Sequence, residues 1–243
     1  METIGDARLY CGDCLEIMPG LGAGSIDLIC ADLPYGVTAC AWDRIIPFDR
    51  LWKEYERILK PTGSAVLTAS QPFTTRLINS KPEWFRYELI WRKNTVTGFL
   101  NAKHQPLRNH ENVIVFSPAN TKHMTYHPQG LVPVHRVRKN PSSRIYNKVA
   151  AGTRVVHYEH YPRSVLEFPS ETARKHPTQK PVALMAYLIL TFSDPGDLVL
   201  DNTMGVGSTG VSALQVGRRF VGIELEEEFY EAAKERIMKI PQG

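Results

Sequence analysis

The sequence of 243 residues predicts an α/β fold, in which a mainly parallel, twisted sheet carries helices on both faces. Three observations predict this fold. Short apolar runs that suit buried strands alternate with segments of helical periodicity. Three of the expected strands end in an acid, and a glycine-rich turn joins one of them to a helix. The chain length suits one domain with an insertion.

The first half of the chain contains four expected strands and one helix. Residues 25–31 form an apolar run that stops at the turn-forming sequence Asp32-Leu33-Pro34-Tyr35-Gly36. Residues 49–59 place apolar side chains at helical spacing, and Pro61-Thr62-Gly63 ends the helix. Further strands are expected at residues 64–68, 87–91 and 112–116.

The second half begins with a segment of a different character. Between residues 117 and 175 the periodicity fades and Pro, Asn, His and Arg dominate, which predicts an irregular insertion. The main domain would then comprise residues 1–116 and 176–243. Pro181 begins a buried helix over residues 182–190. The remaining elements are a strand at 198–200, a helix at 208–216, a strand at 219–223 and a helix at 227–240.

The net charge of +4 is unevenly distributed along the chain. Residues 117–180 contain eleven Lys or Arg and three Glu, a local charge of +8, so the rest of the chain carries −4. A basic segment in an acidic body predicts a surface that binds a polyanion. A solvated loop without a partner is the alternative.

The composition also limits the compartment and the metal chemistry. No apolar run of 18 residues occurs, so we expect no membrane-spanning helix. Residues 1–6 lack the basic start of a signal peptide, which predicts a cytoplasmic protein with free cysteines. Cys11 and Cys14 have the spacing of metal ligands, but the sequence has no second such pair, so we expect no metal site.

Three acids follow expected strands: Asp32, Asp201 and Glu224. In open α/β sheets, ligands bind beyond the carboxyl ends of the strands. The three acids therefore predict a site at one edge of the sheet.

A glycine motif follows Asp201. The segment from Gly205 to Gly210 satisfies G-x-G-x-x-G between a strand and a helix, so the backbone can approach a ligand closely. Glu224 follows Gly205 by 19 residues and is placed to accept hydrogen bonds from two ribose hydroxyls. The pattern fits any adenosine-bearing cofactor, including a nicotinamide cofactor.

The sequence Asp32-Leu33-Pro34-Tyr35 resembles the Asp-Pro-Pro-Tyr signature of the S-adenosylmethionine-dependent DNA amino-methyltransferases. Residues 10–15, 60–63 and 176–181 are similar to further segments of that family, and the resemblance covers most of the chain outside 117–175. The catalytic tetrapeptide precedes the glycine motif, which is the permuted order of the family's beta group. The resemblance implies a Rossmann-like methyltransferase fold in which residues 117–175 recognise the target.

The resemblance also implies roles for the site residues. The catalytic residues would be Asp32, Leu33, Pro34 and Tyr35. The cofactor-binding residues would be Asp13, Cys14, His176, Thr178, Lys180, Asp201, Asn202, Gly205, Gly207, Ser208 and Glu224. The cofactor would be S-adenosylmethionine and the substrate double-stranded DNA. A second copy of the chain and a cognate restriction nuclease would be further partners.

An exocyclic base amine is a poor nucleophile because its lone pair is delocalised into the ring. Two acceptors that bind its N–H groups would aim this lone pair at the sulfonium methyl group. Asp32 supplies one acceptor; by resemblance the Leu33 carbonyl is the second, and Tyr35 stacks on the flipped base. Pro34 restricts Leu33 to extended conformations. Leu33 stands where the family has proline. The replacement keeps the main-chain carbonyl but makes the turn less rigid.

The leading hypothesis is a site-specific DNA adenine-N6 methyltransferase, because the family's cytosine enzymes typically carry Ser at the position of Asp32. A cytosine-N4 methyltransferase with the same machinery is the alternative. A nicotinamide-dependent oxidoreductase would leave residues 32–35 and the basic segment unexplained. A non-catalytic nucleic-acid-binding protein would have no use for a cofactor pocket.

Overall fold

The computed structural model contains two compact units. One comprises residues 1–127 and 164–243, and the other comprises residues 128–163. The residues that the structure describes are 1–38, 40, 43–140, 152–171 and 179–241.

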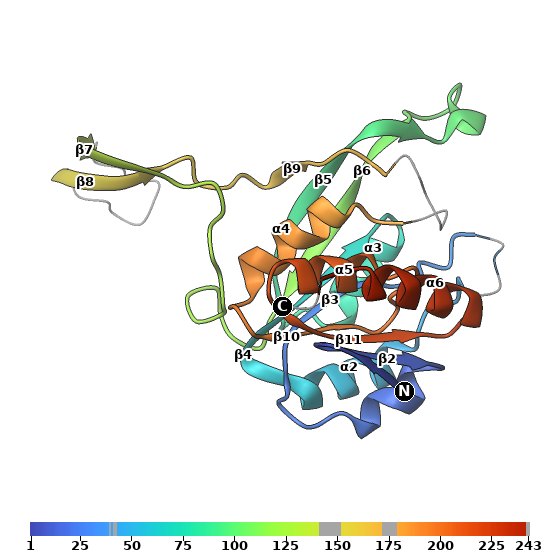
Figure 1. Cartoon of the computed structure of the whole chain (residues 1–243). Coiled ribbons are helices and arrows are strands. Elements are labelled where there is room, and N and C mark those ends of the chain that lie inside the picture. Colours follow the sequence, from blue (N-terminus) through green and yellow to red (C-terminus); the bar gives the residue numbers. More distant parts are fainter. Residues whose placement is uncertain (39, 41–42, 141–151, 172–178, 242–243) are drawn as a thin grey trace. The chain divides into compact units, whose positions relative to one another are not determined.

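A nine-stranded sheet forms the centre of the first unit, with the strand order β1-β2-β11-β10-β3-β4-β6-β5-β9 (Figure 1). Neighbouring strands from β2 to β4 in this order are parallel, whereas β6 runs antiparallel to both β4 and β5. The mainly parallel sheet confirms the predicted fold class. The strands are β1 (Glu2–Ile4), β2 (Ala7–Cys11), β3 (Ile26–Asp32), β4 (Leu59–Ala69), β5 (Phe85–Thr97), β6 (Arg108–Phe116), β9 (Val165–Glu167), β10 (Leu198–Asp201) and β11 (Arg219–Glu224).

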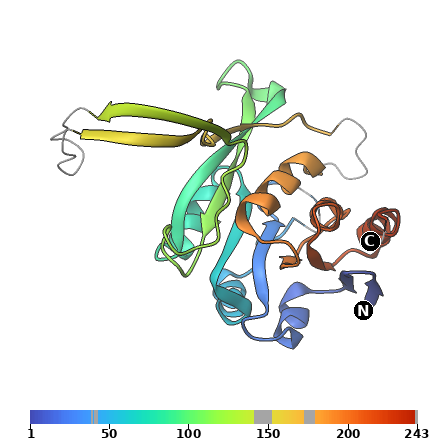
Figure 2. The same cartoon turned by 60° about the vertical axis from the view of Figure 1, so that its left-hand side comes forward.

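Helices cover both faces of this sheet (Figure 2). One apolar core includes Ile29 of β3, and the other includes Leu28 and Cys30, so that β3 is buried on both faces. No helix in the described part of the chain has the length and apolar character needed to cross a membrane. The helices are α1 (Cys14–Ile17), α2 (Phe48–Ile58), α3 (Phe73–Ser80), α4 (Val182–Phe192), α5 (Ser208–Gln215) and α6 (Glu227–Met238), with short 3-10 turns at Met18–Gly20 and Phe99–Asn101.

The strand β4 starts earlier than the sequence predicted. It includes residues 61–63, which were expected to form a turn. Its pairing with β3 moves from Ile26 opposite Leu59 to Leu28 opposite Ser64, so the extra residues form a bulge within the strand. A bulge and a turn share the same composition, which is why the sequence did not distinguish them.

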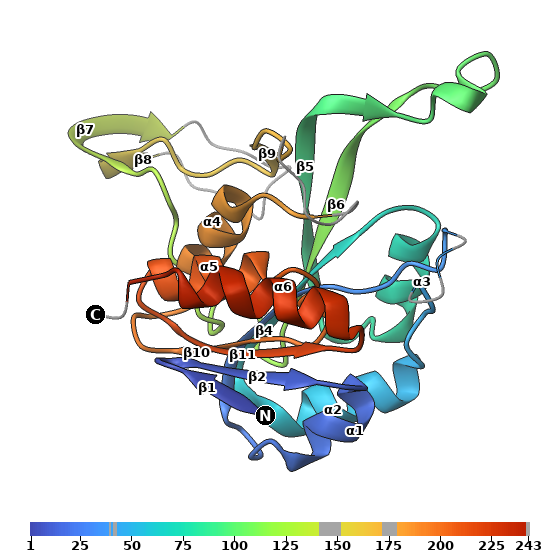
Figure 3. The same ribbon diagram turned by 45° about the vertical axis from the view of Figure 1, so that its right-hand side comes forward.

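The strands β5 and β6 also extend beyond their predicted ends. They form a long hairpin that projects from the sheet (Figure 3). The added residues at the end of β5 are mostly exposed, so they show no apolar alternation. The elements β1, β2, α1 and α3 have no predicted counterpart, because each is only three to eight residues long, too short to show a clear periodic pattern.

The second unit corrects the prediction of an irregular insertion. It is an antiparallel ribbon of β7 (Val132–Asn140) and β8 (Gly152–Glu159). A ribbon of two strands has no buried face, so its residues lack the alternation that marks a strand in a sequence. The predicted insertion also includes β9, which pairs with β5 in the first unit. The use of residues 117–175 for target recognition stays a prediction.

Candidate active site

The carboxyl ends of β3, β10 and β11 meet at one edge of the sheet. The strand β10 lies between the other two and is parallel to both. Asp32, Asp201 and Glu224 therefore end three neighbouring strands, which confirms the predicted gathering of the acids.

A cavity of about 530 Å³ lies at this edge, within the usual size range of small-molecule sites. Gly207 does not line the cavity, because it packs against α6, where an added Cβ would lie 2.9 Å from the Cβ of Ala233. His176 and Thr178 lie outside the described residues. The other twelve predicted site residues line it: Asp13, Cys14, Asp32, Leu33, Pro34, Tyr35, Lys180, Asp201, Asn202, Gly205, Ser208 and Glu224.

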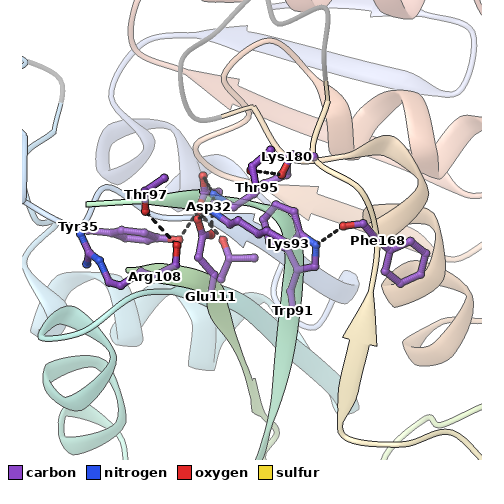
Figure 4. A network of polar contacts seen from close by, with 12 residues as sticks. Asp32, Tyr35, Trp91, Lys93, Thr95, Thr97, Arg108, Glu111, Phe168 and Lys180 are labelled. Atoms are coloured by element: carbon purple, nitrogen blue, oxygen red, sulfur yellow. Dashed lines mark hydrogen bonds and ion pairs between the residues drawn. The ribbon is translucent and has the colours of Figure 1, made fainter. Parts of the chain in front are cut away.

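The Asp32 carboxylate accepts hydrogen bonds from three side chains (Figure 4). Its Oδ1 accepts from the Tyr35 hydroxyl at 2.7 Å and from the hydroxyl of Thr68, the residue opposite Asp32 on β4. Its Oδ2 lies 2.6 Å from Nζ of Lys180. All three partners donate, so the carboxylate is held as an oriented acceptor.

Lys180 lies deep in this site, with 6% of its side chain exposed. Burial favours the neutral amine, but the carboxylates of Asp32 and Glu111 outweigh it and raise the pKa of Lys180. Its Nζ also lies 5.6 Å from the centre of the Tyr35 ring. The sequence predicts Lys180 as a cofactor-binding residue. Among the described residues, it contacts Asp32 and Glu111 through its ammonium group and lies over the ring of Tyr35.

The Tyr35 ring is stacked on Phe73 of α3, with centroids 5.1 Å apart and planes at 25°. Burial, and then the negative charge of Asp32, raise the pKa of the Tyr35 hydroxyl well above its usual range. The phenol is therefore neutral and donates its proton to Asp32. This geometry makes Tyr35 one wall of the cavity.

Asp43 fixes the loop after the tetrapeptide. Its carboxylate accepts from the backbone N–H groups of Gly36 and Val37 at 2.8 Å and of Thr38 at 2.7 Å. Burial acts to raise the pKa of Asp43, but these hydrogen bonds outweigh it and hold the pKa below its usual value. Gly36 has φ +67°, and an added Cβ would lie 2.9 Å from Ile45, so only glycine suits this position.

The other half of the cavity is built around the end of β10. Asn202 accepts from the Tyr55 hydroxyl at 2.6 Å, and its amide nitrogen lies 3.6 Å from Sγ of Cys14. The carboxylate of Glu224 accepts from the backbone N–H groups of Gly205 at 2.7 Å and of Glu226 at 3.0 Å. Each oxygen of Glu224 keeps a second lone pair for a ligand.

The acids make this part of the cavity electronegative. Burial, and then the charges of Asp32 and Glu224, raise the pKa of Asp201 to about 7 against the hydrogen bonds from Thr209 and Thr203. At Gly205, which has φ +52°, no atom of the described residues lies within 4 Å of an added Cβ, so this part of the chain leaves the glycine loop open to a ligand. These features suit a ligand that carries positive charge and hydroxyl donors, as S-adenosylmethionine does.

Several residues of the site were not found from the sequence, among them Thr68, Asp43 and Glu111. Thr68 is the last residue but one of β4, the parallel strand beside β3, so the same argument that found the acids could have found it. Glu111 lies on the antiparallel strand β6, and Asp43 lies in a loop. No local pattern marks either one.

The sheet is mainly parallel, and the glycine loop and residues 32–35 line one cavity at its edge. This combination defines an enzyme of the Rossmann-like methyltransferase class. Residues 26–235 match the family N6_N4_Mtase, described as DNA methylase, and the chain belongs to this family. It is a DNA amino-methyltransferase that uses S-adenosylmethionine as its methyl donor.

Relatives of known name agree with this assignment. The chain is 28% identical to the type II methyltransferase M.HinfI of Haemophilus influenzae, over 94% of this chain and 67% of that protein. It is 29% identical to the DNA adenine methyltransferase YhdJ of Escherichia coli strain K12, over 93% of this chain and 81% of that protein.

Two solved structures share the fold. The M1.HpyAVI–SAM complex has a TM-score of 0.65 and 23% identity, covering 95% of this chain and 99% of that chain. The cytosine-N4-specific PvuII DNA methyltransferase has a TM-score of 0.72 and 17% identity, covering 99% of this chain and 90% of that chain.

Proposed function

We propose that this enzyme methylates the exocyclic N6 amine of adenine at specific sites in double-stranded DNA. One observation carries the proposal: the Asp32 carboxylate lines the same cavity as Gly205 and Glu224. An aspartate at the start of the tetrapeptide, and the similarity to YhdJ, favour adenine over cytosine. The likeness to the PvuII enzyme concerns the fold and does not bear on the base.

In the proposed mechanism, Asp32 accepts one N–H of the target amine through its carboxylate. The main-chain carbonyl of Leu33 accepts the other, so that the nitrogen lone pair points away from both acceptors. Oδ1 of Asp32 already accepts from Tyr35 and Thr68. In this mechanism the amine takes the place of the Tyr35 hydroxyl at Oδ1, which frees the ring of Tyr35 to stack on a base taken out of the duplex.

The cofactor would supply an electrophilic methyl group on a sulfonium. We assign its adenosine part to Asp13, Asn202 and Glu224, where the Glu224 carboxylate would accept from the ribose hydroxyls. Its positive charges would lie beside Asp201 and the open loop at Gly205. Cys14 and Ser208 complete the wall in this proposal.

Mass spectrometry of nucleosides tests the proposal directly. DNA from a methylation-deficient host that expresses the protein should contain N6-methyladenine, and DNA from a host that expresses Asp32→Ala should contain none. N4-methylcytosine in place of N6-methyladenine would give the base specificity to cytosine instead. Methylation-sensitive sequencing of the same DNA would identify the recognition site.

We further propose that the enzyme acts in the cytoplasm as a homodimer and protects DNA from a cognate restriction nuclease. Sedimentation of the purified protein should give twice the mass of the chain. DNA that the enzyme has methylated should resist a nuclease that cuts at the same sequence. A monomer in sedimentation, or cleavage of the methylated DNA, would reject the corresponding proposal.

A further inference from the structure

Four charged side chains of alternating sign form a continuous chain beside the cavity (Figure 4). Asp32 pairs with Lys180, Lys180 lies 3.3 Å from Oε2 of Glu111, and Oε1 of Glu111 pairs with Lys93 of β5. Their side chains are between 6% and 22% exposed. The four charges sum to zero, so the buried group is electrically balanced.

Lys180 and Glu111 stabilise each other's charged forms. The pKa of Lys180 is raised, as described above. Burial acts to raise the pKa of Glu111, but the ammonium groups of Lys180 and Lys93 outweigh it, and the pKa of Glu111 is lowered. Oε2 of Glu111 accepts no hydrogen bond from the described residues, so its contact with Lys180 is one of charge.

A gain in stability does not explain why these four charged side chains are buried together. Removing charges from water costs about as much as their attraction returns, and apolar replacements of buried ion pairs are often neutral or stabilising. What the chain does supply is a fixed geometry. Lys180 holds Oδ2 of Asp32 while Thr68 holds Oδ1, so the carboxylate cannot rotate when the Tyr35 hydroxyl leaves.

We propose that Lys180 is a positioning residue for methyl transfer, which fixes the Asp32 carboxylate and is itself fixed by Glu111 and Lys93. The inference rests on the proposed role of Asp32. It differs from the role in cofactor binding that the sequence predicted for Lys180, because the ammonium acts on the acceptor of the amine. Its loss should therefore affect turnover and leave cofactor affinity unchanged.

The test compares Lys180→Met, Lys180→Arg and Glu111→Gln with the wild type. Turnover is measured with labelled S-adenosylmethionine and unmethylated genomic DNA, and cofactor affinity by calorimetry. We expect kcat of Lys180→Met to fall at least about tenfold, since small misplacements of a reacting group cost up to about a hundredfold. The cofactor Kd and the KM for DNA should change less than twofold. Lys180→Arg keeps the charge and should recover part of kcat.

Lys60→Met is the matched control, because Lys60 pairs with Asp27 near the other end of β3 and does not line the cavity. Its kcat should equal that of the wild type. If Lys180→Met does not fold, Glu111→Gln decides the matter, because glutamine preserves the shape of the side chain. Its kcat should fall severalfold with an unchanged cofactor Kd.

The inference is overturned if Lys180→Met, or Glu111→Gln in its place, keeps kcat within twofold of the wild type. It is also overturned if the cofactor Kd rises by as much as kcat falls. Asp32→Ala, which removes the acceptor oxygens, separates this failure from that of the proposed function. An active Asp32→Ala variant would reject the role of Asp32, whereas an inactive one beside a fully active Lys180→Met would reject the positioning role alone.

Discussion

The hydroxyl of Thr203 donates a hydrogen bond of 3.0 Å to the main-chain carbonyl of Asp32. The backbone N–H of Thr203 also donates to Oδ1 of Asp201 at 3.1 Å. Thr203 thus joins the end of β3 to the loop after β10, although 171 residues separate it from Asp32. A change in the glycine loop can therefore alter the position of Asp32 directly.

Thr203→Val should weaken this connection without changing the shape of the side chain. The carbonyl of Asp32 loses its donor in a partly buried place, which should lower the free energy of unfolding by about 1 to 3 kcal/mol. We also expect kcat to fall severalfold, because Asp32 loses one of its anchors. Urea unfolding and a methylation assay measure both effects. Thr203→Ser keeps the hydroxyl, and equal behaviour of the two variants would contradict the role of this bond.

Glu224→Ala should weaken the binding of S-adenosylmethionine. The loss of charge-assisted hydrogen bonds to ribose corresponds to about 1 to 3 kcal/mol of binding free energy. Calorimetry with the purified protein gives this value directly. Glu228→Ala removes the same charge from an exposed position of α6 outside the cavity and should bind like the wild type. Unchanged affinity in Glu224→Ala would exclude a contact between Glu224 and the cofactor.

Asp201 should make the stability of the enzyme depend on pH. The pKa of Asp201 is about 7 in the folded protein, whereas the ordinary value for an aspartate is 3.8. Between these two values the folded state retains a proton that the unfolded chain has lost. The free energy of unfolding therefore falls as the pH rises from about 4 to about 7, by roughly 4 kcal/mol for such a shift. Above pH 7 the full cost of the buried charge is present.

Asp201→Asn should remove this contribution, since asparagine is neutral at every pH and keeps an oxygen for the N–H of Thr203. Urea unfolding at pH 5 and pH 8 compares the two proteins. We expect the variant to be more stable than the wild type by a larger margin at pH 8 than at pH 5. Parallel pH profiles would show that Asp201 titrates alike in both states.

The sequence predicted those parts of the site that depend on local patterns. Asp32, Asp201 and Glu224 each end an apolar run, and parallel strands bring such ends to one edge. The contact between Lys180 and Asp32 could not be predicted in this way, because the two residues are 148 positions apart in the sequence. Lys180 belongs to the segment before α4 and does not end a strand. Glu111 belongs to an antiparallel strand, for which the rule about carboxyl ends does not hold.

For the ribbon of the second unit, the sequence predicted the charge but not the secondary structure. Its residues 128–163 contain seven Lys or Arg and one Glu, so their charge indicated a polyanion surface even though their pattern gave no strands. The structure adds the arrangement of these charges. A cavity of about 1040 Å³ is lined by Arg136, Arg138, Arg154 and Arg163, together with two histidines.

Glu159 neutralises part of this surface, because its Oε1 lies 3.2 Å from Arg136 and 2.9 Å from Arg138. We expect Glu159→Gln to raise the affinity for DNA of any sequence, since both guanidinium groups become available to phosphates. Arg154→Ala should lower it. Fluorescence anisotropy with a labelled duplex of arbitrary sequence, at several salt concentrations, measures both variants.

The dependence on salt distinguishes a phosphate contact from a general change in charge. Each phosphate that a Lys or Arg neutralises contributes about −0.9 to the slope of log affinity against log salt concentration. Arg154→Ala should therefore flatten the slope by nearly one, and Glu159→Gln should make it steeper. Arg50→Ala removes one exposed arginine of α2, which pairs with Glu16, and serves as the control. If Arg50→Ala and Arg154→Ala flatten the slope equally, the ribbon is not the surface that holds DNA, because the effect then follows net charge alone.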